Sequence, residues 1–347
     1  MPPENRAIHR TAPAVLIAFF VLKPITDTMS MRFLFNIISG ISVLAEADNE
    51  RLFGAVRTFF DAYPVAAGHD KVQSTLIRLR FFTDKKHDIK IDPDKPHLFS
   101  YGHLKGYEID EGLLLSDGTT IGIVDKRNNI FTGYVGGAML KRGSWFSSVF
   151  LTIGLIELLR CNGLYYLHAA GVRGAGRSML LCGMGMSGKT TLALGLVFNG
   201  FQLCSDDAVF LRYEDKKASA LGFKKPINVT GDTIKLYGRF LKGAVMPDPP
   251  FKKSNIPYSY FNTVEEIVPD TIMFLERGGE DGTIIKRIDK TRAMAMLIPQ
   301  SLMLFMDEEY AGRHAAVLNV LLNQVKSYEA ILGRDVLKNP LSVIRDH

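Results

Sequence analysis

One stretch of the chain, residues 179–211, constrains the fold more than any other. It opens with an apolar run at 179–182 and continues through a glycine-rich loop at 183–188. Leucines at helical spacing follow as far as Gly200, and a second apolar run occupies 201–204. Glycine commonly follows the last turn of a helix because it adopts the left-handed backbone conformation without strain. The pattern predicts strand, loop, helix, turn and strand, which indicates an α/β fold.

The loop fits G-x-x-x-x-G-K-[ST], the phosphate-binding P-loop pattern. Glycines allow a tight turn, so that successive amide groups face one concavity and hold phosphate oxygens, and the helix N-terminus adds positive charge. Lys189 is expected to reach the β- and γ-phosphates of ATP, and Thr190 to offer its hydroxyl to Mg²⁺. The residues predicted to bind the nucleotide are Gly183, Met184, Gly185, Met186, Ser187, Gly188, Lys189, Thr190 and Thr191.

The same letters also match G-x-G-x-x-G, the fingerprint of dinucleotide sites, with an acidic residue following Gly188 at a suitable distance. A dinucleotide site does not require a Lys-Thr pair directly after the third glycine. The sequence downstream does not show the second strand–helix–strand unit that a dinucleotide-binding fold needs. The sequence therefore favours a nucleoside triphosphate with Mg²⁺.

Two adjacent carboxylates, Asp206 and Asp207, close the second apolar run. In a P-loop sheet the carboxyl ends of the strands face the nucleotide. One carboxylate can then hold Mg²⁺, while the other orients an acceptor hydroxyl and takes its proton. A polar turn or a helix cap is the alternative interpretation of this pair.

The whole chain sets wider limits. Its 347 residues suffice for two domains, and a net charge of +6 suits partners with phosphates or acidic groups without selecting one. The three cysteines, Cys161, Cys182 and Cys204, show neither metal spacing nor a disulfide framework, which favours a reducing cytoplasm. Cys182 and Cys204 end predicted strands and are expected to be small buried residues. No nucleic-acid partner is predicted.

Residues 1–30 are interpreted as an extension of unclear status, either an extra segment or a start codon placed too early. Their apolar run at 12–22 is too short to span a bilayer, so no membrane partner is predicted. Residues 31–150 are expected to form a smaller α+β domain, since helical spacing and turn-separated apolar runs alternate there. The expected helix covers 51–62, and the expected strands cover 33–44, 76–82, 106–109, 113–115, 120–124 and 130–135. His87, His97 and His103 with Asp110 match no known metal-ligand spacing.

The second half begins with helical spacing at 145–159 and a predicted strand at 165–172 that carries His168 close before the loop. A loop-rich segment at 223–256 contains several lysines and is a candidate for contact with substrate or phosphate; a solvated surface loop is the equal alternative. These lysines are Lys224, Lys225, Lys242, Lys252 and Lys253. Further on we expect a hairpin of 271–275 with 283–288, helices over 292–306 and 307–325, and a strand at 327–332.

His168, the loop and the Asp206-Asp207 pair, at these spacings, resemble the HPr kinase/phosphorylase family. These enzymes have a P-loop fold related to phosphoenolpyruvate carboxykinase and phosphorylate a serine of the carrier protein HPr. The resemblance is specific over roughly residues 150–225 and general in layout beyond them. It implies a P-loop kinase domain at 151–347, behind the α+β domain.

The resemblance also implies roles for individual residues. Asp206 resembles the general base of the family, and Lys189 its phosphate-binding lysine. Thr190 and Asp207 resemble the groups near Mg²⁺. His168 resembles a histidine close to the phosphate site that donates to a phosphate oxygen. Core members form hexamers, so a homo-oligomer is an expectation from the resemblance alone.

The sequence departs from the core members at 220–226, which reads Ala-Leu-Gly-Phe-Lys-Lys-Pro in place of an acidic-Ile-Arg-Gly signature. Without the matching Glu, phosphorylase activity and HPr as the substrate are not implied. Divergent relatives include kinases that phosphorylate a serine on lasso-peptide precursors. The expected activity is therefore an ATP-dependent serine kinase acting on an HPr-like carrier or a precursor peptide.

Two other classes of function stay open on the sequence. One is a nucleotide-binding regulatory protein with little transfer activity. The other is a small-molecule kinase or carboxykinase-like enzyme, which would turn over a metabolite without a protein acceptor.

Overall fold

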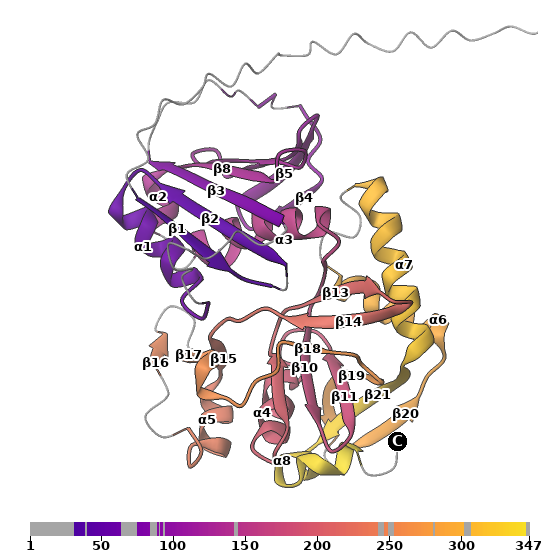
Figure 1. The fold of residues 1–347 in the computed structure, drawn as a ribbon. Coiled ribbons are helices and arrows are strands. Elements are labelled where there is room, and N and C mark those ends of the chain that lie inside the picture. Colours follow the sequence, from indigo (N-terminus) through magenta and orange to yellow (C-terminus); the bar gives the residue numbers. More distant parts are fainter. Residues whose placement is uncertain are drawn as a thin grey trace, which may run out of the picture.

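The computed structural model describes residues 31–38, 40–63, 75–83, 89, 91–92, 94–141, 145–241, 246–248, 253–279, 282–301 and 307–344. Within them the chain is a mixed α/β protein with four sheets (Figure 1). The expected extension at 1–30 lies outside the described residues, as do His87, Lys242, Lys252 and residues 302–306 of an expected helix.

The N-terminal sheet has the strand order β1-β2-β3-β8-β7-β6-β5-β4. β2, β3 and β8 run parallel, and the other neighbours are antiparallel. The strand expected over 33–44 is wrong, because the chain turns through Gly40 (φ +82°) and forms two antiparallel strands. The strands are β1 (Met31–Asn36), β2 (Ile41–Ala47), β3 (Thr75–Thr83), β4 (Phe99–Tyr101), β5 (Leu104–Ile109), β6 (Gly112–Ser116), β7 (Ile121–Asp125) and β8 (Ile130–Val135).

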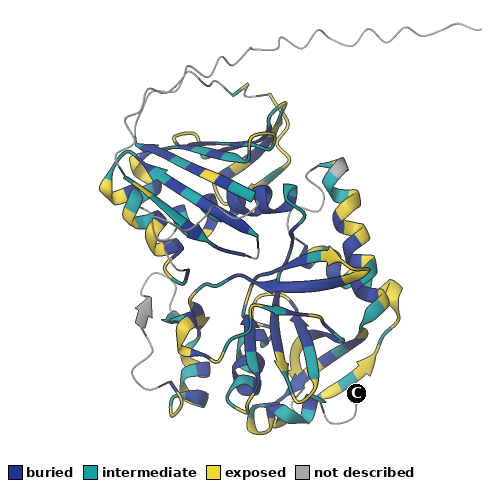
Figure 2. Cartoon of the chain, in the orientation of Figure 1, coloured by how far each residue is buried: buried dark blue, intermediate teal, exposed yellow. Residues whose placement is uncertain are grey.

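Helices pack against this sheet around a large apolar core (Figure 2). They are α1 (Glu50–Phe59), α2 (Gly137–Lys141), the π-helix η1 (Phe146–Leu151) and α3 (Thr152–Cys161). The predicted helix at 51–62 is confirmed as α1, and the side chain of Asn49 accepts two amide hydrogen bonds at its start. The run at 145–159 is helical as expected, but its first part is a π-helix. The same core includes α3 and reaches Phe210 and Phe223 of the later chain.

A second sheet carries the loop and has the order β12-β10-β11-β19-β21-β20. β11, β19 and β21 run parallel. The expected hairpin of 271–275 with 283–288 is wrong, because β21 lies between β19 and β20 and pairs with both. The strands are β10 (Ala169–Gly174), β11 (Arg177–Cys182), β12 (Gln202–Ser205), β19 (Thr271–Gly279), β20 (Ile284–Arg287) and β21 (Lys326–Gly333).

Both faces of the P-loop sheet are covered. Its alternate residues face α4 (Lys189–Val197) on one side, and α6 (Lys290–Leu297) and α7 (Glu308–Gln324) on the other. On β11, for example, Leu181 belongs to the first core and Leu180 to the second. A strand buried on both faces needs a continuous apolar run, which is what the sequence shows at 179–182. Cys182 and Cys204 are fully buried, as predicted.

Two smaller sheets complete the chain, in the orders β18-β14-β13-β9 and β15-β17-β16. The single strand expected at 165–172 is wrong, because β9 and β10 belong to different sheets and His168 lies between them. The strands are β9 (Tyr165–Leu167), β13 (Val209–Glu214), β14 (Lys217–Gly222), β15 (Ile227–Val229), β16 (Met246–Asp248), β17 (Lys253–Ile256) and β18 (Glu266–Ile267). The remaining helices are α5 (Gly231–Tyr237), α8 (Asp335–Lys338), η3 (Tyr258–Tyr260), η4 (Ile298–Gln300) and η5 (Pro340–Ile344).

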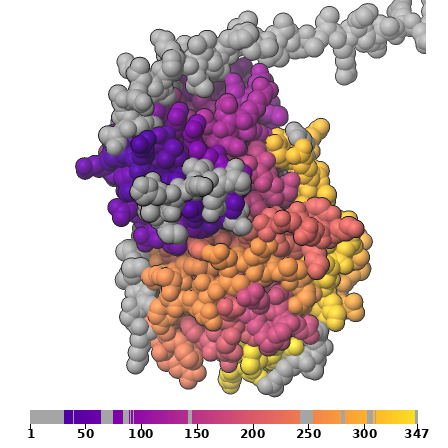
Figure 3. All heavy atoms as spheres, in the orientation of Figure 1, coloured from indigo at the N-terminus to yellow at the C-terminus, as the bar shows by residue number. Residues whose placement is uncertain are grey.

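In Figure 3 the early part of the chain, in indigo and purple, lies against the later part, in salmon to yellow. Helix α3 contacts β7 and β8 of the N-terminal sheet as well as β9 of the later chain. Across the described residues, each helix is too short or too polar to cross a bilayer.

Candidate active site

The glycine-rich loop joins β11 to α4, and its backbone depends on glycine at two points. Gly183 has φ +153°, and a Cβ there would lie 2.6 Å from the carbonyl oxygen of Leu275 and from Oγ of Ser187. Gly188 has φ +100° directly before the first residue of α4. A side chain at either position would displace the loop, so the motif glycines follow from the geometry of the turn.

Lys189 curls back into this loop. Its side chain is buried, and Nζ donates to the carbonyl oxygens of Gly183 at 2.6 Å and Met184 at 3.3 Å. The ammonium group and the N-terminus of α4 together give the loop a positive interior. Such a concavity suits the phosphates of a nucleotide.

Thr190 and Asp206 form the next pair. Oγ1 of Thr190 donates to Oδ2 of Asp206 at 3.1 Å, which joins the start of α4 to the end of β12. A hydroxyl and a carboxylate are hard oxygen ligands of the kind Mg²⁺ accepts, and Mg²⁺ usually takes its other ligands from water and phosphate. The donor set therefore fits Mg²⁺ bound together with a nucleotide. Within the described residues no group of three His, Cys, Asp or Glu side chains forms a metal site by itself, and this holds for His97, His103 and Asp110.

Asp207 points away from that pair. Its carboxylate is 68% exposed, and Oδ1 lies 3.2 Å from Nδ1 of His168. The same Nδ1 lies 3.0 Å from the backbone oxygen of Asp207. Both partners are acceptors, so we place the ring proton on Nδ1. The backbone amide of His168 donates to the carbonyl oxygen of Gln300 at 2.8 Å, which fixes the histidine between the two sheets.

Burial lowers the pKa of His168, and the neighbouring Asp207 opposes that change only in part. The neutral ring, with its proton on Nδ1, has an unprotonated Nε2. Donation from Nε2 to a phosphate oxygen, as the resemblance implies, would therefore require the doubly protonated ring.

A cavity of about 1080 Å³ opens in front of these groups. His168, Thr190, Asp206 and Asp207 line part of it. The walls beyond them are mainly apolar and come from β4, η1, α3 and η4, together with Lys225 and its neighbours. The cavity thus lies between the N-terminal sheet and the loop, with room for a nucleotide and an acceptor group.

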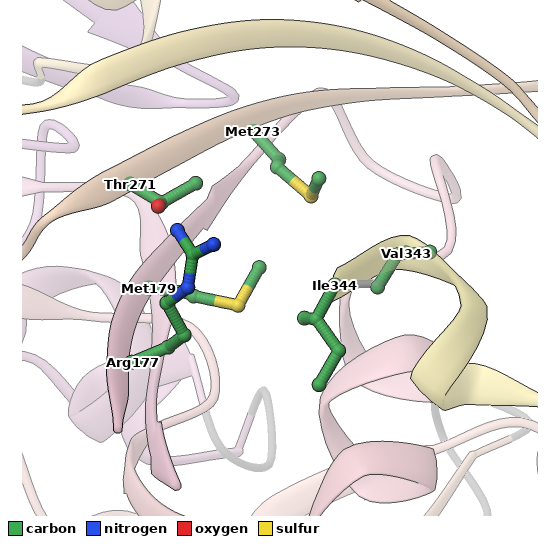
Figure 4. A pocket seen from close by; sticks show the side chains of 6 residues that line it. All are labelled: Arg177, Met179, Thr271, Met273, Val343 and Ile344. Atoms are coloured by element: carbon green, nitrogen blue, oxygen red, sulfur yellow. The ribbon is translucent and has the colours of Figure 1, made fainter. Parts of the chain in front are cut away.

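A second cavity, lined by residues of β11, β19 and η5, is far smaller (Figure 4). Its volume of about 10 Å³ has room for about one water molecule. It is lined by Arg177, Met179, Thr271, Met273, Val343 and Ile344. A cavity of this size offers no room for a substrate.

The structure brings the sequence-predicted residues into one region, with one exception. Thr191, predicted to bind nucleotide, directs its hydroxyl to that of Thr233 in α5 at 2.9 Å. The sequence did not single out Thr152, Tyr166 or Gln300, which also line the cavity. Nothing in the motif pattern marks them, because they come from other elements and meet the loop only in the fold.

No family model matches the chain, and no curated protein matches it in sequence. Among solved structures, the Hpr(Ser) kinase/phosphatase from Coxiella burnetii is similar with a TM-score of 0.28 and 15% sequence identity. The match covers 51% of this chain and 90% of that chain. A TM-score this low carries no argument for function, so the chemistry of the site has to come from its own residues.

Proposed function

We propose that this protein is a phosphotransferase that moves the γ-phosphoryl group of ATP to a serine hydroxyl of a protein or peptide, with Mg²⁺ as cofactor. The observation that carries the proposal is the Lys189 ammonium inside a glycine loop, beside the Thr190–Asp206 pair. Asp207, exposed and also lining the cavity, adds a carboxylate that does not bind Thr190.

In this proposal the loop amides and Lys189 bind the β- and γ-phosphates. Mg²⁺, held by Thr190 and Asp206, supplies neutralising charge on the phosphate oxygens when bound. The acceptor oxygen attacks the γ-phosphorus in line, the bond to the bridging oxygen breaks, and ADP leaves with that electron pair. The hydroxyl proton passes to the acceptor-side carboxylate.

The contacts support an allocation of the two aspartates opposite to that implied by the family resemblance. Thr190 already binds Asp206, so Asp206 is the better candidate for the metal. Asp207 lines the cavity, and the Nδ1–H of His168 donates to its backbone oxygen and lies beside its carboxylate, which orients the side chain. We therefore propose Asp207 as the base that accepts the hydroxyl proton, and His168 as the residue that positions it.

We further propose that residues 151–347 form an HPr-kinase-like domain and that residues 31–150 form a smaller α+β domain on the acceptor side, with α3 packed into the core of the smaller one. The support is the cavity wall, to which β4 contributes opposite the loop. α3 packs into the core of the N-terminal sheet, so the wall of the cavity combines both parts of the chain.

Nucleotide binding can be tested with two adjacent threonines. Thr190→Ala removes the hydroxyl that faces Asp206, whereas Thr191→Ala removes one that faces Thr233. Titration calorimetry with ATP should show that Thr190→Ala loses most of the Mg²⁺-dependent gain in affinity, and that Thr191→Ala keeps it. Equal behaviour of the two variants would contradict the metal role of Thr190.

Transfer itself is tested with γ-labelled ATP, Mg²⁺ and separate acceptors: HPr and serine-containing peptides. Label on a serine, absent with Lys189→Ala, is the expected result. Tight ATP binding without label on any acceptor would instead support a regulatory nucleotide-binding protein.

A further inference from the structure

Among the lysines of the basic segment whose side chains the structure describes, Lys225 lines the cavity and Lys224 does not. Lys225 follows β14 in the link to β15, and its Nζ donates to Oγ1 of Thr152 at 3.2 Å. The ammonium lies 4.9 Å from the ring centre of Phe59 and 5.0 Å from that of Phe223. A cation is thus held against two aromatic rings in the wall of the cavity.

No carboxylate of the described residues forms an ion pair with Lys225. Its neighbour Lys224 differs, because Nζ of Lys224 lies 2.7 Å from Oε1 of Glu265. Burial lowers the pKa of Lys225 to about 8, even though Asp207 attracts the charged form. The chain therefore keeps a cation in an apolar wall where its charge is poorly compensated.

Thr152 fixes the direction of this cation. Its hydroxyl donates to the carbonyl oxygen of Ser147 at 2.8 Å and so presents a lone pair to Lys225. Ser147 belongs to the π-helix η1, and π-helical turns are frequent at functional sites. An ammonium has three N–H donors, and within the described residues one of them is used by Thr152. The others are available to a ligand in the cavity.

We propose that Lys225 is an anion-binding residue of the cavity, which takes an oxyanion on the acceptor side of the reacting hydroxyl. The ligand chemistry is a phosphate or carboxylate oxygen next to an apolar surface. Two sources supply it: the phosphoryl group as it reaches the acceptor, or a carboxylate that the acceptor itself carries. The inference deepens the proposed function and rests on it for the assumption that an acceptor hydroxyl binds in this cavity.

The test follows the ammonium of Lys225 directly. Lysines of the full-length protein are labelled biosynthetically with ¹³C and ¹⁵N, which leaves all three N–H donors in place, and the side-chain signals of Lys225 and Lys224 are assigned with Lys225→Arg and Lys224→Arg. The pKa of each lysine is measured by NMR in three samples: protein without added anion, protein with sodium phosphate and protein with sodium acetate. The Lys189→Ala variant is measured in the same way, since it removes the lysine of the phosphate loop.

In Lys189→Ala, phosphate should raise the pKa of Lys225 by about one unit, because an anion that binds tenfold more tightly to the charged form shifts it by that amount. Lys224 should not respond. A response to phosphate alone supports the phosphoryl group as the source, and a response to acetate as well supports an acceptor carboxylate. An unchanged Lys225 with both anions would overturn the inference.

A structural role makes a different prediction for stability. If Lys225 serves only to hold Phe59 and Phe223, Lys225→Met should lower the melting temperature. If it is retained to bind an anion, Lys225→Met should unfold at the same temperature or higher, because a buried cation is replaced by an apolar chain of similar length. If Lys225→Met clearly lowers the melting temperature, and the pKa of Lys225 in the unsubstituted protein does not respond to either anion, then Lys225 has only a structural role. Failure of ATP to bind would instead contradict the proposed function and would not affect the anion test.

Discussion

Asp206 and Asp207 are neighbours in the chain, but their side chains have different partners. Asp206 accepts from Thr190, and Asp207 lies against His168. The sequence predicts that both aspartates lie near the loop, since they end a strand beside it. The sequence does not predict which aspartate contacts Thr190 and which contacts His168. That choice depends on the turn after β12 and on the position of His168 between two sheets.

Because the two aspartates have different partners, substitution of each should impair a different step. Asp207→Asn should keep ATP affinity within about twofold and lower phosphoryl transfer by roughly 10²–10⁴, the usual contribution of a general base. Asp206→Asn should weaken Mg²⁺ binding at least about tenfold, since it removes a charged oxygen ligand. Calorimetry and single-turnover transfer separate the two effects. Transfer that survives in Asp207→Asn but not in Asp206→Asn, with metal affinity unchanged, would restore the opposite allocation.

A second histidine predicts a pH dependence of stability. His314 is fully buried against the ring of Tyr165, and burial lowers its pKa to about 4. The unfolded chain binds the proton near pH 6.5 and the folded chain does not, so stability is present above pH 6.5 and falls as the pH approaches 4.

The expected slope from this one group is about 1.4 kcal/mol of unfolding free energy per pH unit between those values. Urea unfolding at pH 7 and pH 5.5 measures it, and His314→Leu is the matched variant. The variant should be less sensitive to pH than the parent across this window. Equal sensitivity would mean that His314 titrates normally in the folded protein.

Among the elements, helix α3 carries a buried ion pair that belongs to a larger network of charges. Glu157 and Arg160 are each 1% exposed and form a two-point ion pair, at 3.0 Å and 2.6 Å. Lys126, at the turn after β7, lies 3.2 Å from Glu157 and also pairs with Asp307, just before α7. The network joins the N-terminal sheet, α3 and α7 at one point.

Removal of one partner from such a network leaves a buried charge without compensation. Glu157→Ala should therefore cost roughly 3–5 kcal/mol of unfolding free energy. Glu46→Ala removes the partner of the partly exposed Arg80 and should cost below about 1 kcal/mol. Urea denaturation of both variants provides the comparison. A similar small loss in both would show that α3 does not depend on the Glu157 charge.

The predicted elements also show where sequence patterns stop being informative. Apolar period and turn residues were enough to predict α1 and most strands of the N-terminal sheet, because the period that marks a helix or a strand lies within the element itself. They failed at β19 and β20, which are close in sequence but separated in space by β21. They also failed at His168, where one apolar run supplies strands to two sheets. Neighbour choice is a property of the whole sheet, which no single window contains.

At the scale of the molecule, the site joins parts of the chain that are distant in sequence. Loop, helix and Asp pair come from a continuous stretch, and the motif alone was enough to place them together. The opposite wall comes from β4, η1 and α3, and no motif connects these to the loop. Lys225 lies between the two groups, in a segment whose role the sequence left undecided between substrate contact and solvated loop.

A ligand that binds only the folded chain should stabilise it. ATP with Mg²⁺ at about 100 times its dissociation constant should add about 2.7 kcal/mol to the unfolding free energy. The Lys189→Ala variant should gain far less under the same conditions. Thermal or urea unfolding with and without nucleotide checks this expectation, and stabilisation of equal size in the variant would place the nucleotide elsewhere.

The order of strands in the P-loop sheet has a consequence for how the protein is made. β11 ends at Cys182, but its parallel neighbour β19 is complete only at Gly279. At roughly 5–20 residues per second, a ribosome needs about 5–20 seconds to add these roughly 100 residues. For that time β11 emerges with one edge open, while the N-terminal sheet has had all its strands since Val135. The part of the nascent chain that most needs protection from aggregation is therefore the phosphate-binding strand itself.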